Sequence, residues 1–76
     1  MEVRWDAQKA ALNYSKHGIS FADAATALDD PMALTLEDRR HAEQRFVTLG
    51  LDARGRLLVV VYGYPASADV VRLISA

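Results

Sequence analysis

The sequence predicts an α+β fold in which two N-terminal helices pack on one face of an antiparallel β-sheet. Up to Pro31, helix-forming residues and apolar side chains follow the spacing of amphipathic helices. After Pro31, the pattern changes to extended segments separated by short polar turns. The expected order of elements is β-α-α-β-β-β-β, and two helices followed by a meander of strands place both helices on one side of the sheet.

The first predicted helix covers Ala7–His17 and follows a short strand over Glu2–Trp5. This helical segment contains strong helix formers and neither proline nor glycine. Asp6 is a suitable N-cap, and Gly18 supplies the left-handed conformation that commonly ends a helix. Trp5 is expected to pack in the core against the helices.

The second predicted helix begins after Ser20, a suitable N-cap residue with Asp23 three positions further on. Asp29–Pro31 ends this helix, because the residue before a proline disfavours helical backbone. Its buried stripe is expected from apolar residues at helical spacing, namely Phe21, Ala24, Ala25 and Leu28.

Four strands are expected in the second part of the chain, joined by a charged loop, a hairpin turn and a further turn. The strands cover Met32–Leu36, Glu43–Leu51, Arg56–Tyr62 and Val70–Ser75, and the connections are Glu37–Ala42, Asp52–Gly55 and Gly63–Ala68. Alternation along the second of these strands places one set of side chains on one face: Arg45, Val47, Leu49 and Leu51. Because Arg56–Tyr62 is nearly all apolar and β-branched, it is expected to be a central strand buried on both faces.

The composition excludes several classes of protein. The 76 residues suffice for one small domain, and the absence of cysteine excludes disulfides and thiolate-bound metals and fits a cytosolic compartment best. The net charge of −1 counts against a simple nucleic-acid-binding module, which is normally basic. The longest apolar run, Leu57–Tyr62, is too short to cross a membrane. The histidines lack metal-ligand spacing and no phosphate-binding loop is present, so neither a metal nor a cofactor is expected.

The remaining polar residues are compatible with metal-free RNA cleavage. This reaction needs a base for the 2′-hydroxyl proton, an acid for the leaving 5′-oxygen, and fixed cations for the charged phosphorane. The candidate acid–base set consists of Lys16, His17, His41 and Glu43. The candidate cations lie on three predicted strands and share one face if the register allows: Arg45, Arg56 and Arg72.

The same residues also have structural explanations. Lys16 and His17 lie in the last turn of a helix, where positive charge is favourable without any function. Arg56 flanks a hairpin, where charges commonly protect strand ends. Arg72 interrupts an apolar strand and must reach solvent or find a partner. From spacing alone, these residues permit a ribonuclease but do not require one.

Several short sequence motifs follow one another in order over almost the whole chain. The first group leads through the predicted helix boundary to an Asp-Pro pair: Trp5, Asp6, Lys9, Asn13, Lys16–Phe21 and Asp30–Pro31. Three later segments follow it: Glu43–Gly50, Gly55–Tyr62 and Arg72–Ala76. In this order the segments resemble the BrnT family of bacterial toxins, whereas a single Lys-His-Gly triplet would carry no weight.

The resemblance implies a ribonuclease toxin of a type II toxin–antitoxin system, with a RelE-like or microbial-RNase-like α+β fold. Such toxins inhibit translation by cutting RNA in the bacterial cytoplasm. A BrnA antitoxin with a ribbon-helix-helix DNA-binding part neutralises them, and the complex represses its own operon. The expected partners are therefore the antitoxin and RNA, with DNA contacted only through the antitoxin and no membrane involved.

For this family we expect the active site to be centred on the strand arginines. Phosphate binding and transition-state stabilisation are assigned to Arg45, Arg56 and Arg72. Lys16 and His17 are expected at the rim of the site, and the proton-transfer group is expected to be His17 or Glu43.

Two departures from the family pattern support an alternative. Family members carry an arginine in the turn after the central strand, whereas this chain has Gly63-Tyr64-Pro65. Family members also continue into a basic C-terminal helix, which a single toxin domain over residues 1–76 would lack. The alternative is a catalytically degenerate toxin that keeps an antitoxin-binding surface and regulates the operon.

Overall fold

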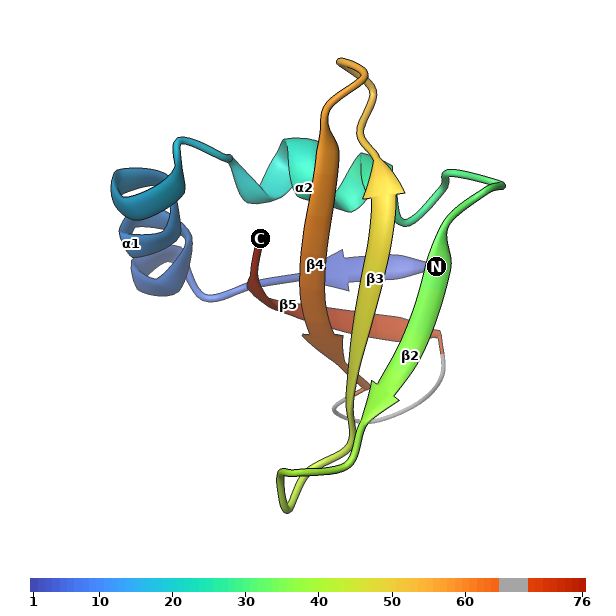
Figure 1. The fold of residues 1–76 in the computed structure, drawn as a ribbon. Helices are drawn as coiled ribbons and strands as arrows, with labels where there is room; N and C mark the ends of the chain where they lie inside the picture. Colours follow the sequence, from blue (N-terminus) through green and yellow to red (C-terminus); the bar gives the residue numbers. More distant parts are fainter. Residues whose placement is uncertain (65–68) are drawn as a thin grey trace.

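The computed structural model describes residues 1–64 and 69–76 and contains two helices and a five-stranded sheet (Figure 1). The helices are α1 (Ala7–His17) and α2 (Phe21–Ala27). The strands are β1 (Glu2–Arg4), β2 (Leu34–Asp38), β3 (Arg45–Leu51), β4 (Leu57–Gly63) and β5 (Val70–Ser75). The element order confirms the predicted β-α-α-β-β-β-β arrangement and the α+β class.

The sheet has the strand order β1-β5-β4-β3-β2 and is mixed. Strands β2 to β5 form the predicted antiparallel meander, whereas β1 lies parallel to β5, with Val3 opposite Val71. A strand of three residues at the start of the chain carries no local signal for its partner or its direction, so the sequence did not specify this edge. The turn expected over Gly63–Ala68 lies largely outside the described residues, and Gly63 itself ends β4.

The corner between the helices forms as predicted. Gly18 has a φ of 70° and its N–H donates to the Tyr14 carbonyl oxygen, which ends α1 in the left-handed conformation. Ser20 then caps α2, because its Oγ accepts a hydrogen bond from the Asp23 N–H at 3.1 Å. The bounds of α1 agree with the predicted helix, since both of its ends are set by local capping residues.

The bounds of four strands, β1 to β4, differ from their predicted ranges by one or two residues. Strand β2 begins and ends two residues later than expected, so Glu37 and Asp38 belong to the strand and not to the charged loop. Strand β3 begins at Arg45, so Glu43 lies in the loop that precedes it. A short apolar run predicts that a strand forms, but the residues at which the strand begins and ends depend on its pairing partner.

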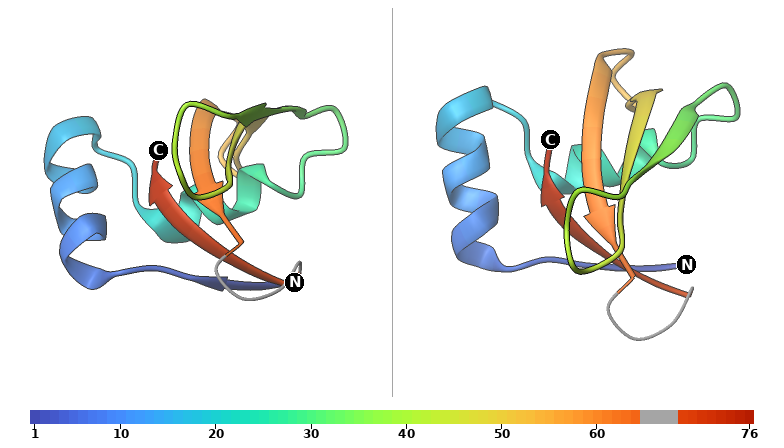
Figure 2. Two further views of the ribbon diagram at one scale, coloured as in Figure 1. Left: turned by 90° about the horizontal axis from the view of Figure 1, so that it is seen from below. Right: turned by 60° about the horizontal axis from the view of Figure 1, so that its bottom comes forward.

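The core lies between α2 and one face of the sheet (Figure 2). Its buried side chains come from α2, β4 and β5, and they are Phe21, Ala24, Ala27, Leu58, Val60, Tyr62, Val71 and Leu73. The expectation that Trp5 is a core residue is only partly met. Its ring packs edge-to-face on Phe21, with centroids 6.1 Å apart, but 41% of the residue stays exposed because no further element covers it.

The expectation that the strand Arg56–Tyr62 is buried on both faces is wrong. Only the side chains that point toward α2 are buried, while Leu57 and Val59 on the other face are 64% and 53% exposed. Both helices lie off that second face, so no element of the described chain covers it. We call this surface of β2, β3 and β4 the apolar face, and its residues are Leu34, Leu36, Val47, Leu49, Leu51, Leu57, Val59 and Val61.

Candidate active site

Arg45 and Arg72 are brought together by one carboxylate. Glu43 Oε1 accepts hydrogen bonds from Arg45 Nε and Nη2 at 3.2 and 3.1 Å. Its other oxygen, Oε2, accepts a hydrogen bond from Arg72 Nη2 at 3.0 Å. We call this group the Arg45–Glu43–Arg72 cluster, and it unites three of the residues that the sequence indicated.

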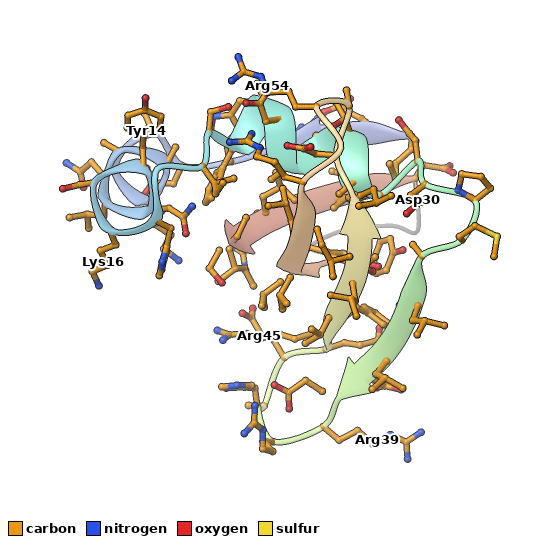
Figure 3. The ribbon with its side chains drawn as sticks, turned by 45° about the horizontal axis from the view of Figure 1, so that its top comes forward. Tyr14, Lys16, Asp30, Arg39, Arg45 and Arg54 are labelled. Atoms are coloured by element: carbon orange, nitrogen blue, oxygen red, sulfur yellow. The ribbon has the colours of Figure 1, made fainter. Side chains whose placement is uncertain are left out.

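The sheet register explains why the two arginines meet. Arg45 of β3 and Arg72 of β5 both pair with Gly63 of β4, so they flank the same position of the central strand. Gly63 has no side chain to separate them. The cluster lies at the end of the sheet opposite the β3–β4 hairpin, at the boundary of the apolar face (Figure 3).

The cluster carries two guanidinium groups and one carboxylate. The hydrogen bond from Arg45, together with the charges of both arginines, holds the pKa of Glu43 below its ordinary value despite partial burial. Glu43 therefore stays ionised, and the cluster keeps one positive charge in excess. Arg72 Nε is buried without a hydrogen-bond partner among the described residues, so this arginine also has an unused donor.

Arg56 does not belong to this cluster. It lies at the other end of β4, where its Nε donates to Asp52 Oδ2 at 2.8 Å and its Nη2 donates to Asp23 Oδ2 at 2.9 Å. Residues of even number on β4 point toward α2, and Arg56 precedes that strand on the same side. The register thus leaves Arg45 and Arg72 on one face and turns Arg56 to the other, which corrects the expectation that all three share a face.

The bonds of Arg56 dock the hairpin onto α2. Asp52 is buried and accepts hydrogen bonds from the N–H groups of Arg54 and Arg56 at 3.0 and 2.8 Å. The hydrogen bond to Asp52 raises the pKa of Arg56 further above its already high ordinary value. A second contact reaches the same helix, because the Ala53 N–H donates to Thr26 Oγ1 at 2.8 Å.

Lys16 and His17 lie apart from the cluster, in the last turn of α1. With Lys9 they line a cavity of about 280 Å³ whose other walls are Leu12, Asn13, Ile74 and Ser75. We call this cavity the α1 pocket. Its wall on β5 begins two residues after Arg72, so the pocket and the cluster are joined along that strand.

Lys9 is the residue of this group that the sequence reasoning missed. Its spacing from Asn13 and Lys16, at i, i+4 and i+7, places the three residues on one helix face, but a solvated polar face explains such spacing equally well. The contact of that face with β5 could not be read from α1 alone.

The remaining expected residues lie in the β2–β3 loop or beside it. His41 Nε2 lies 3.6 Å from Asp38 Oδ2, next to the bidentate pair formed by Asp38 and Arg40. That hydrogen bond to Arg40 keeps the pKa of Asp38 far below its ordinary value. Gly63-Tyr64-Pro65 is the segment that departs from the family pattern. Here Tyr64 packs edge-to-face on Phe46, while Pro65 lies outside the described residues.

Comparisons with known proteins assign this chain to a family. The model of a family described as "Ribonuclease toxin, BrnT, of type II toxin-antitoxin system" matches residues 5–76. A search of curated proteins finds no match. Within the part of the chain that the structure describes, no helix is long and apolar enough to cross a membrane. The match includes every residue of the cluster and of the α1 pocket, and the chain belongs to the BrnT family of ribonuclease toxins of type II toxin–antitoxin systems.

Proposed function

We propose that this toxin is a metal-independent endoribonuclease that inhibits translation by cutting RNA in the cytoplasm. The observation that carries the proposal is the Arg45–Glu43–Arg72 cluster, in which two guanidinium groups share one carboxylate. Guanidinium groups bind phosphate oxygens in bidentate fashion and stay charged at any physiological pH. Two of them at one position can neutralise the phosphorane without a metal ion.

In this proposal Glu43 holds the arginines and does not carry the proton. A carboxylate with a lowered pKa is a weak base, and the bonds to both arginines occupy its oxygens. His17 is the candidate proton-transfer group, because an imidazole ring has one nitrogen that can accept a proton and one that can donate a proton. The α1 pocket, which His17 lines, adjoins the cluster along β5. Its lining residue Ile74 is two positions after Arg72, a spacing of roughly 7 Å along a strand.

The test is cleavage of RNA by the purified toxin, free of antitoxin and in the presence of EDTA. We expect cleavage that persists with the chelator and is lost in Arg45→Ala and Arg72→Ala. Arg54→Ala is the matched control, because Arg54 is an exposed residue of the β3–β4 hairpin, at the end of the sheet opposite the cluster. Intact RNA with the wild-type protein would exclude the activity, and cleavage that EDTA stops would exclude the metal-free mechanism.

The catalytically degenerate toxin remains the second candidate, and the absence of an arginine at Gly63-Tyr64 favours it. It predicts antitoxin binding without cleavage, and without inhibition of growth on expression. The two candidates are separated by measuring both activities on the same preparation.

For the partner, we propose a BrnA-like antitoxin with a ribbon-helix-helix part, which binds the toxin on the apolar face. A type II system includes a protein antitoxin, and apolar patches of this kind mark protein interfaces. Rows of facing side chains such as Leu34, Leu49 and Val59 cross β2, β3 and β4. One end of the face adjoins the excess positive charge of the cluster, so we expect an antitoxin segment with apolar side chains and an acidic residue at that end.

Binding of the protein encoded beside the toxin gene tests this surface. We expect Leu36→Asp to weaken the complex at least 10-fold, because Leu36 is 74% exposed and an aspartate there would be desolvated at the interface. Tyr14→Asp on α1 is the control, since Tyr14 is also exposed but lies outside the apolar face. Equal affinity of both variants, with circular dichroism showing intact folds, would place the antitoxin elsewhere.

A further inference from the structure

The positive side chains of this toxin fall into two groups. Every arginine forms a salt bridge with an aspartate or glutamate, and His41 lies beside Asp38. In residues 1–64 and 69–76, three positive or protonatable side chains have no acidic partner: Lys9, Lys16 and His17. All three line the α1 pocket.

Helix electrostatics explains only part of this group. Lys16 and His17 lie in the last turn of α1, where a cation is favourable. Lys9 lies in the first turn, where the helix dipole disfavours a cation. The N-cap carboxylate of Asp6 accepts a hydrogen bond from the Gln8 N–H and forms no salt bridge with Lys9 in the described structure. Helix electrostatics therefore does not explain the position of Lys9, whereas binding of an anionic ligand by the unpaired cations of the pocket would explain it.

The pocket also has an apolar side and a fixed frame. Leu12 and Ile74 contribute apolar surface beside the cations, and Leu12 is largely exposed. Asn13 holds the frame, because its side chain bonds both to the Ile19 carbonyl oxygen and to the Ala76 N–H. A volume of about 280 Å³ is at the lower end for ligand sites, which suits one nucleotide.

We propose that the α1 pocket binds one nucleotide of the RNA substrate beside the scissile bond. Lys9 and Lys16 bind its phosphate, and Leu12 and Ile74 contact the face of its base. This inference rests on the proposed RNA cleavage. The strand β5 leads from Arg72 to the pocket, so an RNA backbone that lies along it meets the cluster first and the pocket one nucleotide further.

The first experiment compares cleavage of a short RNA by wild type, Lys9→Gln and Lys9→Arg. We expect Lys9→Gln to raise KM about 5-fold or more with little change in kcat, because it removes a phosphate contact away from the reacting atoms. The slope of log affinity against log salt should fall by roughly 0.7, as for one phosphate contact on a single strand. Lys9→Arg should restore both values.

Arg39→Gln is the matched control, since it removes one positive charge from the β2–β3 loop, far from α1 (Figure 3). Its KM and salt slope should match those of the wild type. If Lys9→Gln behaves like this control while the wild type cleaves RNA, the pocket proposal fails and the proposed function stands.

A binding measurement separates the two proposals if the wild type does not cleave. Adenosine 5′-monophosphate and inorganic phosphate are titrated against the protein and followed by NMR. We expect the nucleotide to shift the signals of Lys9, Leu12 and Ile74 and to bind more tightly than phosphate does. Shifts confined to other residues, or equal affinity for phosphate, would overturn the nucleotide site.

Discussion

Asn13 of α1 and Ala76, the residue after β5, are joined by a hydrogen bond of 3.0 Å from the Ala76 N–H to Asn13 Oδ1. Asn13 is the one buried residue of α1, and its Nδ2 donates to the Ile19 carbonyl oxygen at 3.2 Å. A single amide thus attaches the first helix to the last strand and to the corner that follows the helix. The geometry of the α1 pocket depends on this side chain.

Replacement of that amide should destabilise the fold. In Asn13→Ala, the partly buried Ala76 N–H and Ile19 carbonyl oxygen lose their partner, which costs about 1–3 kcal/mol of unfolding free energy. Urea denaturation measures the loss, and Ser15→Ala on the exposed side of α1 should change stability by less than roughly 0.5 kcal/mol. If the two variants were equally stable, α1 would not be held through Asn13.

Gly50 should not tolerate a side chain, because the backbone of α2 passes close to β3 at this point. A Cβ at Gly50 would lie 2.7 Å from the Ala27 carbonyl oxygen and 3.2 Å from Ala33 Cβ. Relief requires backbone movement, so we expect Gly50→Ala to lower the free energy of unfolding by about 1–3 kcal/mol or more.

Gly18→Ala is the comparison for this effect. A Cβ at Gly18 would meet nothing within 4 Å, and only its φ of 70° disfavours alanine, by roughly 1 kcal/mol. A loss for Gly50→Ala no larger than that for Gly18→Ala would show that α2 does not pack so closely on β3.

Acid should weaken the attachment of the hairpin to α2 through Asp52. Burial would raise the pKa of Asp52, but the hydrogen bonds from Arg56 and Arg54 outweigh it and hold the pKa below its ordinary value. Such a carboxyl stabilises the fold fully above its unfolded pKa of about 3.9, and this contribution is lost as the pH falls through the folded pKa. The urea midpoint should therefore decrease as the pH is lowered below about 5.

Asp52→Asn identifies the group responsible for this dependence. The variant should have a lower midpoint than the wild type at pH 7, and its midpoint should fall less on acidification. Parallel curves for the two proteins would assign the acid sensitivity to other carboxylates.

Arg56 and Arg72 should separate stability from activity. Arg56→Gln breaks the bonds to Asp52 and Asp23, so we expect a lower midpoint of unfolding and nearly normal kcat in the folded protein. Arg72→Gln leaves the hairpin intact, and we expect kcat to fall by about 100-fold or more, as for loss of a transition-state contact. Cleavage rates and thermal melts on the same samples check both expectations, and a loss of kcat in folded Arg56→Gln would return that arginine to the site.

The sequence predicted the helices well because their ends are local. Asp6, Gly18 and Ser20 cap α1 and α2 in the predicted places, and each acts within four residues of its own position. The direction of side chains on the strands depended instead on register and on distant partners. The even-numbered side of β4 proved to face α2, which took Arg56 out of the predicted arginine group.

The apolar run of β4 shows a second limit of sequence reasoning. A strand that is apolar on both faces indicates burial on both, whether a helix of the same chain or another protein covers the second face. Within the described structure Leu57 and Val59 stay exposed, since neither helix covers them. The apolar pattern alone therefore does not show whether the second face is covered within the same chain.

The position of β5 within the sheet also has a consequence for synthesis of the toxin. Because β5 lies between β1 and β4, the first strand has no neighbour until the last strand has left the ribosome. The same event brings Arg72 to Glu43 and Ala76 to Asn13. Contacts between such distant parts of the chain form late in folding. A nascent toxin therefore cannot assemble its arginine cluster before β5 has emerged from the ribosome.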